Sequence, residues 1–97
     1  MDTVLFSTVL FSLGHCAITH GAMTALEAIH VEPATLLRRH QCGDWGNLCQ
    51  QDRQTNYEAV TDGFRVFSAY ELTSAVRVWV ITDADRSSTT ILLPDEY

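Results

Sequence analysis

Hydropathy alternates with a period of two residues over much of the C-terminal third of the chain. Residues 64–72 and 76–81 match this period, which is typical of strands because successive side chains point to opposite faces of a sheet. Residues 88–93 are predicted to form a final strand. Both faces of residues 77–82 are largely apolar, which favours a central strand. Pro94 ends the last strand. The pattern therefore predicts three consecutive strands of a small antiparallel sheet.

A fourth strand is predicted near the N-terminus. Residues 11–19 alternate loosely and end in Thr-His-Gly, so we expect a strand there that joins the sheet. The preceding residues 4–10 are β-branched and aromatic, which fits either an extra strand or an apolar arm. The placement of residues 1–12 stays open between these two structures.

Two to three short helices are expected between the N-terminal strand and the C-terminal strands. Thr19 can cap a helix over about residues 21–30, whose apolar side chains share one face. Pro33 fits the first turn of a second helix. A third, peripheral helix is predicted over about residues 47–60 and is ended by Gly63. The stripe that it would turn towards the protein is only weakly apolar: Leu48, Asp52, Thr55 and Ala59.

Length and composition place these elements in one α+β domain. The 97 residues match a single domain, and 46% apolar with 19% charged residues suits a packed core rather than a disordered chain. The predicted fold is a small antiparallel sheet, made of the three C-terminal strands plus the N-terminal strand, packed against two to three short helices.

The charged residues are biased in sign and in type. The chain has twelve acidic residues, six arginines and no lysine, and its net charge is −6. Because guanidinium groups favour bidentate pairing with carboxylates, we expect the arginines in local ion pairs. The acidic balance argues against direct binding to nucleic-acid phosphates. It favours instead a protein partner with a basic surface, including one that itself binds nucleic acid.

The cysteines and histidines argue against disulfides and a metal site. Three cysteines are an odd number, unlike a secreted disulfide framework. The spacings from His40 to Cys42 and from Cys42 to Cys49 match no zinc template, so small buried cysteines are favoured and no metal is expected. His15 and Cys16 are adjacent, so on a strand they point to opposite faces and cannot form a nucleophile–base pair directly.

Motifs for cofactors and for targeting are missing. The chain has no GxxxxGK[ST] loop, no GxGxxG after a strand, no HExxH and no GxSxG, so no cofactor is expected. The apolar N-terminal run opens with Asp2, has no early basic residue, and is too short and too broken by hydroxyl residues to cross a bilayer. We therefore expect a cytoplasmic protein with reduced thiols.

A tight turn is predicted where two glycines flank Asp44 and Trp45. A tryptophan on such a turn is a candidate interface anchor, and it can equally fold back as a lid over the junction of two helices. Asp44 is expected to cap the following helix or to close the turn, because its carboxylate can accept backbone N–H bonds.

The corner at residues 83–90 concentrates Asp83, Asp85 and Arg86 with four hydroxyl residues between two apolar runs. As a hairpin turn, its acids bond local amides and Arg86 pairs with one of them. As a general acid/base site, the two carboxylates need a pocket that drives their pKa values apart. As a binding edge, the hydroxyls and the arginine meet a partner. The turn is favoured over catalysis, and a binding role is compatible with it.

Two sequence blocks carry a resemblance to a known family. Residues 39–46 (RHQCGDWG) and 84–97 (ADRSSTTILLPDEY) are specific, and similarity extends over about residues 13–97. The chain resembles the small "plasmid-related" proteins of bacterial mobile elements, often labelled as a type I restriction enzyme modification subunit. The chain contains neither the cofactor-binding glycine loop nor the [ND]PP[YF] tetrapeptide of a methyltransferase, so methyltransferase activity is not expected.

The resemblance implies a role in the conflict between mobile DNA and host defence. The leading hypothesis is a non-enzymatic, acidic interaction protein that inhibits a host nucleic-acid-targeting complex, as anti-CRISPR or anti-restriction proteins do, by binding a basic protein surface. Asp85 and Arg86 would orient the contact, and Trp45 would anchor it. The alternatives are a small enzyme or ligand-binding domain that uses Asp83, Asp85 and Arg86 with a histidine, and a homodimer formed through a sheet edge or the N-terminal arm. The residues assigned to partner binding are Asp44, Trp45, Asp83, Asp85 and Arg86.

Overall fold

The computed structural model describes residues 9–97. The predicted N-terminal arm or extra strand, residues 4–10, lies largely outside this range. In chain order the elements are β1 (His15–Ile18), α1 (His20–Ala28), α2 (Pro33–Gln41), α3 (Gln50–Asp62), β2 (Val66–Glu71), β3 (Arg77–Thr82), β4 (Ser88–Leu92) and a short 3-10 helix η1 (Pro94–Glu96). The predicted α+β class is confirmed, with three helices and a four-stranded sheet.

The sheet is mixed rather than antiparallel throughout. Its strand order is β1-β4-β3-β2, with β3 in the interior as expected. The pairs β2–β3 and β3–β4 are antiparallel, whereas β1 runs parallel to β4 with His15 opposite Ser88 and Ile18 opposite Ile91. The expectation of an antiparallel N-terminal strand was therefore wrong. The chain passes through all three helices and two strands before it reaches β4, and such a crossover permits the parallel direction.

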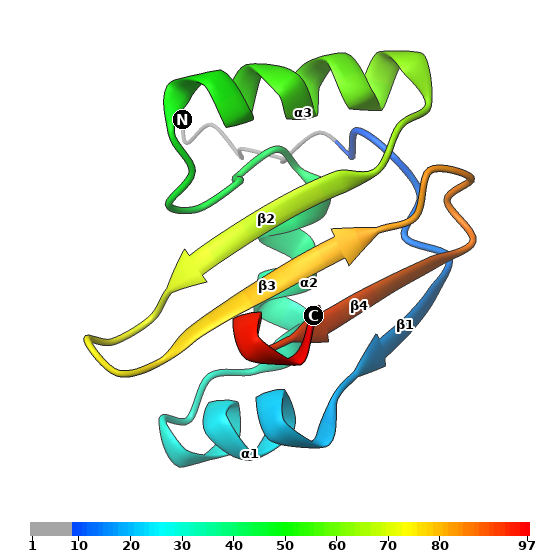
Figure 1. Cartoon of the computed structure of the whole chain (residues 1–97). Helices are drawn as coiled ribbons and strands as arrows, with labels where there is room; N and C mark the ends of the chain where they lie inside the picture. Colours follow the sequence, from blue (N-terminus) through cyan, green and yellow to red (C-terminus); the bar gives the residue numbers. More distant parts are fainter. Residues whose placement is uncertain (1–8) are drawn as a thin grey trace, which may run out of the picture.

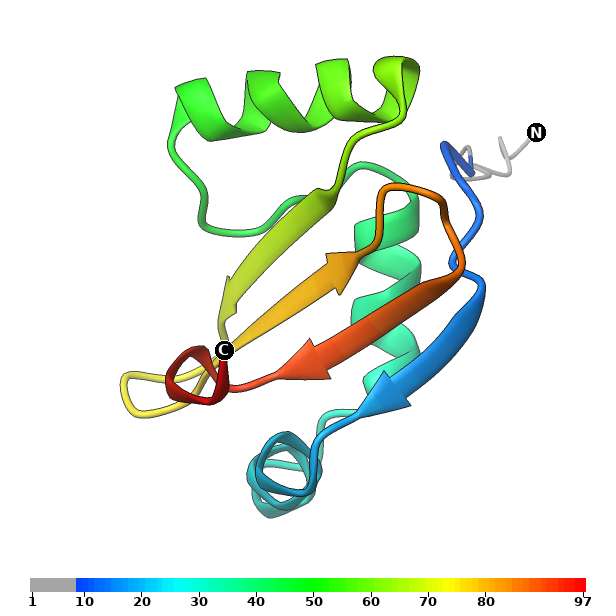
Figure 2. The ribbon, with the colours of Figure 1, turned by 45° about the vertical axis from the view of Figure 1, so that its right-hand side comes forward.

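The two faces of the sheet are covered differently. The helix α2 packs behind β3 in Figures 1 and 2, and the short η1 lies on the opposite face. The main core lies between α1, α2 and the sheet. Its buried residues are Ala22, Leu26, Leu36, Tyr70, Val78, Val80 and Ile91. These side chains stabilise the fold mainly by removing apolar surface from water.

The outer edge of β2 is covered by groups from other parts of the chain. The amide of Phe67 donates to Oδ1 of Asn56 on α3 (3.1 Å), and residues 45–47 pair with Ala69 as a short parallel bridge. The amide of Glu71 donates to Oδ1 of Asn47 (2.9 Å). Edge strands offer unpaired backbone groups to other chains, and here side chains and a loop occupy those of β2. Among the described residues, no strand pairs with the outer side of β1.

The helix boundaries follow the predicted signals. The Thr19 hydroxyl accepts the amide of Ala22 (3.1 Å) at the start of α1, Pro33 opens α2, and Gly63 ends α3 with φ 78°. The predicted inner stripe of α3 was right at Ala59 and wrong at Asp52 and Thr55, which are exposed, and the second buried residue of the helix is Asn56. Among residues 9–97, none of the helices has the length and apolar character needed to cross a membrane.

Candidate functional site

The predicted corner is the turn between β3 and β4, and Arg86 fastens it to the end of α3. The guanidinium donates to the backbone carbonyls of Phe64 (2.7 Å) and Ala59 (2.9 Å), and also to those of Asp83 and Ala84 (both 3.2 Å). A cation near the last carbonyls of a helix also suits the helix dipole. The expected pairing of Arg86 with a carboxylate was wrong, because five fixed N–H groups let one arginine satisfy several carbonyls at once. Its expected role in orienting the corner is compatible with this clamp.

The two acids of the corner are exposed and make only local bonds. Oδ2 of Asp83 accepts the Ser88 hydroxyl (2.6 Å), and Oδ1 of Asp85 accepts the amide of Ser87 (3.0 Å). Hydrogen bonds from the Ser87 hydroxyl and amide lower the pKa of Asp85. A general acid at neutral pH needs a raised pKa, so Asp85 is a stable negative charge rather than a proton donor.

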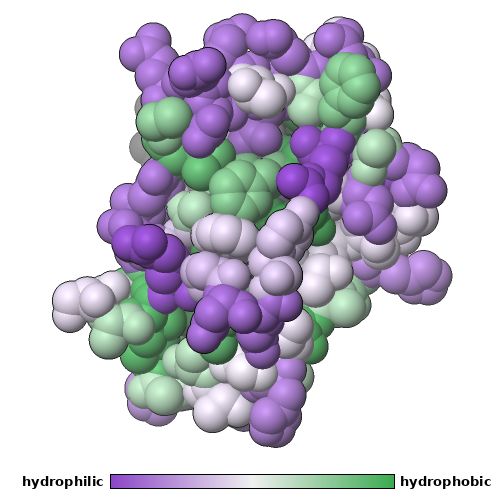
Figure 3. All heavy atoms as spheres, viewed as in Figure 1, coloured by the Kyte–Doolittle hydropathy of each residue, from purple (hydrophilic) through white to green (hydrophobic). Residues whose placement is uncertain are grey.

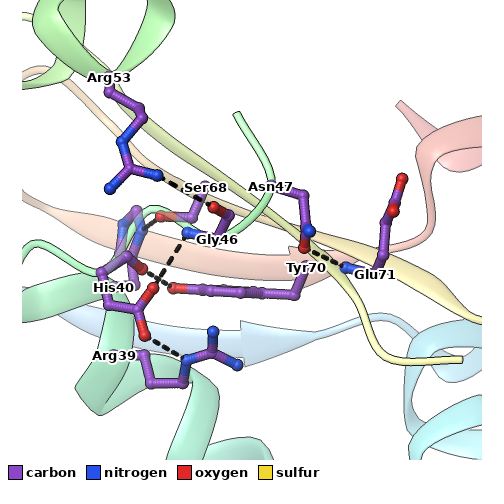
Figure 4. Close-up of polar contacts among 9 residues, drawn as sticks. Arg39, His40, Gly46, Asn47, Arg53, Ser68, Tyr70 and Glu71 are labelled. Atoms are coloured by element: carbon purple, nitrogen blue, oxygen red, sulfur yellow. Dashed lines mark hydrogen bonds and ion pairs between the residues drawn. The ribbon is translucent and has the colours of Figure 1, made fainter. Parts of the chain in front are cut away.

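The second predicted contact, the turn at residues 43–46, is held by an ion pair and an aromatic ring (Figure 4). Oδ2 of Asp44 accepts Nε of Arg39 (2.6 Å), and its Oδ1 accepts the amide of Gly46 (3.2 Å). The guanidinium of Arg39 lies 4.4 Å from the ring centre of Tyr70, whose hydroxyl donates to the carbonyl of Asp44 (2.6 Å). The bond from Arg39 holds the pKa of Asp44 below its ordinary value. Asp44 therefore closes the turn, one of its two expected roles, and does not cap α3, whose N-cap is Cys49.

Trp45 lies inside the protein and is not a surface anchor. Its exposed fraction is 0%, and its ring packs against those of Phe11, His40 and Tyr57 with centroids 5.6–6.3 Å apart. The assignment of Trp45 to partner binding was therefore wrong, and the lid interpretation is the one observed. The turn that directs Trp45 into the core depends on Gly46, because a Cβ atom at this position would lie 2.1 Å from the carbonyl oxygen of Ala69.

A buried chain of hydrogen bonds starts at His40, next to the same turn. Nδ1 of His40 lies 2.6 Å from the Ser68 hydroxyl, and Nε2 lies 2.9 Å from that of Thr82. Thr82 contacts the Thr89 hydroxyl (2.7 Å), which in turn donates to the carbonyl of Leu13 (2.7 Å). Because the Leu13 carbonyl can only accept, Thr89 donates to it, and Thr82 in turn donates to Thr89. The Thr82 hydroxyl therefore accepts from Nε2 of His40, which carries the proton of the ring, and the Ser68 hydroxyl donates to Nδ1. Burial, together with the charge of Arg86, lowers the pKa of His40 to about 3.

The alternative of an acid–histidine site gains no support from this arrangement. His40 is fully buried and both of its ring nitrogens have partners within the core. His15 is exposed on β1, with Ser88 opposite it in the strand register. Within residues 9–97 no three side chains of histidine, cysteine, aspartate or glutamate come together as a metal site.

The acids form an exposed and mostly unpaired surface. All eleven acidic side chains of residues 9–97 are exposed, and two of them take part in ion pairs, Asp44 with Arg39 and Glu71 with Arg77 (both 2.6 Å). The expectation of local ion pairs is thus confirmed for Arg39 and Arg77, and within residues 9–97 it is wrong for the other four arginines, Arg86 among them. Near the corner, Asp62 ends α3 beside the carbonyls that Arg86 binds.

One surface that the sequence reasoning missed is the sheet face opposite α2. It carries an aromatic ladder, with Phe67 and Trp79 centroids 5.0 Å apart and Trp79 and Tyr97 centroids 5.7 Å apart. Figure 3 views this face, with apolar residues at its centre and hydrophilic residues of α3 above. Beside the ladder is a hollow of about 240 Å³, lined by Arg65, Ile81, Asp83, Thr90, Leu92 and Tyr97. The sequence pattern of residues 76–81 does place Trp79 and Ile81 on one face of the strand. Because both faces of this strand are largely apolar, however, the pattern indicated that both are buried.

No family model, curated protein or solved structure matches this chain. Function is therefore inferred from the surface, the charge and the two sequence blocks.

Proposed function

We propose that this protein is a non-enzymatic interaction protein of a mobile genetic element, plasmid or phage, that inhibits a host nucleic-acid-targeting defence complex of the restriction or CRISPR type. The observation that carries the proposal is the exposed, largely unpaired set of carboxylates. Such a surface attracts a basic protein groove and competes there with nucleic-acid phosphates.

The corner is the part of that surface with the best-defined geometry. Arg86 ties the β3–β4 turn to the end of α3 through carbonyl groups, so it leaves the carboxylates of Asp83 and Asp85 unneutralised. The low pKa of Asp85 keeps that residue charged well below neutral pH. Fixed charges on a braced turn lose little conformational freedom on binding. Asp44 is paired with Arg39 and contributes less net charge.

The mobile-element setting comes from the resemblance of residues 39–46 and 84–97 to small plasmid-related proteins. In that setting the partner is a cytoplasmic complex with a basic channel for DNA or RNA. The structure fits this role in one physical respect, because the corner exposes acids where its only arginine is turned inwards to backbone carbonyls.

The test is protection of incoming DNA in a host that carries an active restriction or CRISPR system. Cells that express the full chain should accept a targeted plasmid or phage more efficiently than cells that do not. The triple change Asp62→Asn, Asp83→Asn and Asp85→Asn should abolish most of this protection. The matched triple change Glu27→Gln, Glu32→Gln and Asp95→Asn alters the net charge equally at other exposed sites and should retain most of it.

A purified pair of inhibitor and target should also show binding that weakens as NaCl rises from about 0.05 to about 0.5 M, because screening shortens the reach of exposed charges. Absence of protection against every defence system tested, or binding that does not respond to salt, contradicts the proposal. An equal loss of protection in both triple variants would assign the effect to net charge and would contradict a special role of the corner.

A further inference from the structure

The aromatic face, defined as Phe67, Trp79 and Tyr97, lies on the side of the sheet opposite α2, where Tyr97 is exposed and Phe67 and Trp79 are half-buried. Trp79 lies between the other two rings, edge-on to each of them. Tyr97 is 67% exposed. Large aromatic surfaces left in water are typical of contact sites, since their burial supplies much of the energy of an interface.

The protein already places guanidinium groups on its own aromatic rings. The Cζ atoms of Arg39 and Arg86 lie 4.4 Å and 5.5 Å from the ring centres of Tyr70 and Phe11. On the open side, Arg65 lies 5.5 Å from the ring centre of Tyr97 and donates to its hydroxyl. Half of the six arginines are thus stacked on rings, and one of these stacks is part of the exposed surface.

The hollow beside Tyr97 adds a carboxylate to this surface. Asp83 and Arg65 line it together with Ile81 and Leu92, which supply apolar walls. Oδ2 of Asp83 accepts the Ser88 hydroxyl, and its second oxygen remains available to a donor from outside. A ring, an apolar wall and a carboxylate are the groups that bind a guanidinium by stacking, by contact with its methylene stem and by ion pairing.

We propose that the aromatic face and its hollow receive arginine side chains of the basic partner, which stack on Tyr97 and Trp79 and pair with Asp83. This inference rests on the proposed function, because it specifies what the acidic surface attracts. The corner connects the two roles, since Asp83 belongs both to its exposed acids and to the hollow. The occupant is an arginine-bearing segment rather than a lysine-bearing one, since a planar, weakly hydrated guanidinium stacks on rings better than an ammonium group does.

Two peptides of equal charge test the inference, one of six arginines and one of six lysines. Binding to the full chain is measured by calorimetry and by tryptophan fluorescence, in which Trp79 reports because it is half-exposed whereas Trp45 is buried. We expect the arginine peptide to bind about threefold to tenfold more tightly than the lysine peptide, since an exposed or partly desolvated stack supplies a factor of this order.

Variants then separate stacking from charge. Tyr97→Ala and Trp79→Leu should bring the affinity ratio close to one without weakening the lysine peptide, and Tyr97 is exposed enough that its removal leaves the core intact. The control Tyr57→Leu removes another exposed ring, on α3, and should keep the ratio. Asp83→Asn should weaken both peptides.

The outcomes distinguish the inference from the proposed function. Equal affinity for the two peptides, or a ratio that survives both ring variants, overturns the aromatic site and leaves the acidic interaction protein standing. Tighter binding of single-stranded oligothymidine than of either peptide, or a stable dimer in sedimentation that Tyr97→Ala dissolves, assigns the face to another occupant and also overturns it. Absence of binding by both peptides at low salt contradicts both proposals.

Discussion

The turn at residues 43–46 and the corner at residues 83–90 both combine aspartate with a nearby arginine, but the arginine binds different groups in the two places. In the turn at residues 43–46, Arg39 meets the carboxylate of Asp44 and the following tryptophan is buried. In the corner at residues 83–90, Arg86 donates its hydrogen bonds to backbone carbonyls and to no carboxylate, and both acids remain exposed. The first turn is therefore built into the fold, whereas the second divides its residues between bracing the fold and presenting charge. An aspartate near an arginine in a sequence does not show which arrangement is present.

The variant Gly46→Ala, in the first of the two turns, should have the largest effect on stability. Gly46 has φ 76°, and an added Cβ would lie 2.1 Å from the carbonyl of Ala69. We expect the free energy of unfolding to fall by about 3–5 kcal/mol, because strain and a backbone clash combine. Gly63→Ala is the control, since its φ is 78° but nothing lies within 4 Å of the new atom, and it should cost about 1 kcal/mol. Similar losses for the two variants in urea unfolding would show that the turn at residues 43–46 can relax.

The second test removes the clamp of the corner by Arg86→Met. The carbonyl of Phe64 loses its charged donor, whereas that of Ala59 still accepts the amides of Gly63 and Phe64. We expect a loss of about 2 kcal/mol, typical of a hydrogen bond to a charged group. The exposed Arg38, changed to Met, is the control and should alter stability by less than about 0.5 kcal/mol. If Arg86→Met left the free energy of unfolding unchanged in the same urea assay, Arg86 would not brace the corner.

The strand positions, helix caps and fold class could be predicted from the sequence, because each depends on local period or on capping residues such as Thr19 and Gly63. The direction of β1 could not, since its pairing with β4 forms across most of the chain. The burial of Trp45 and the partners of Arg86 depend on groups from distant elements. The exposed aromatic face was missed because a strand with two apolar faces is usually buried on both sides.

The third test concerns His40, which belongs to the first block and lies in the core. Its folded-state pKa is lowered to about 3, against about 6.5 for the free side chain. The unfolded chain therefore binds the additional proton below pH 6.5, and the free energy of unfolding falls as pH decreases from 6.5 towards 3, while it is constant above 6.5. Between pH 7.5 and 5.0 the loss should be about 2 kcal/mol.

The variant His40→Gln should flatten this slope, since glutamine does not titrate, although its stability at pH 7.5 will be lower if the bonds to Ser68 and Thr82 are imperfect. His30→Asn alters an exposed histidine whose φ of 58° asparagine tolerates, and it should retain the wild-type slope. Urea unfolding at several pH values measures both. An unchanged slope in His40→Gln would place the titrating group elsewhere.

Removal of one carboxylate from each turn should have the smallest effect on stability, and it compares the two turns most directly. Asp44→Asn removes one partner of an ion pair whose side chains are 38% and 51% exposed, so solvent screening limits the loss to about 0.5–1 kcal/mol. Asp85→Asn removes a charge that accepts the Ser87 amide, which asparagine can also accept, and it should change stability by less than about 0.5 kcal/mol. Binding to a basic partner should respond in the opposite order, because Asp85 is unpaired and Asp44 is already neutralised by Arg39. Urea unfolding and calorimetric titration of the same two variants with the six-lysine peptide measure both quantities. Equal effects on binding would mean that the partner reads net charge alone, and the division of labour within the corner would then be wrong.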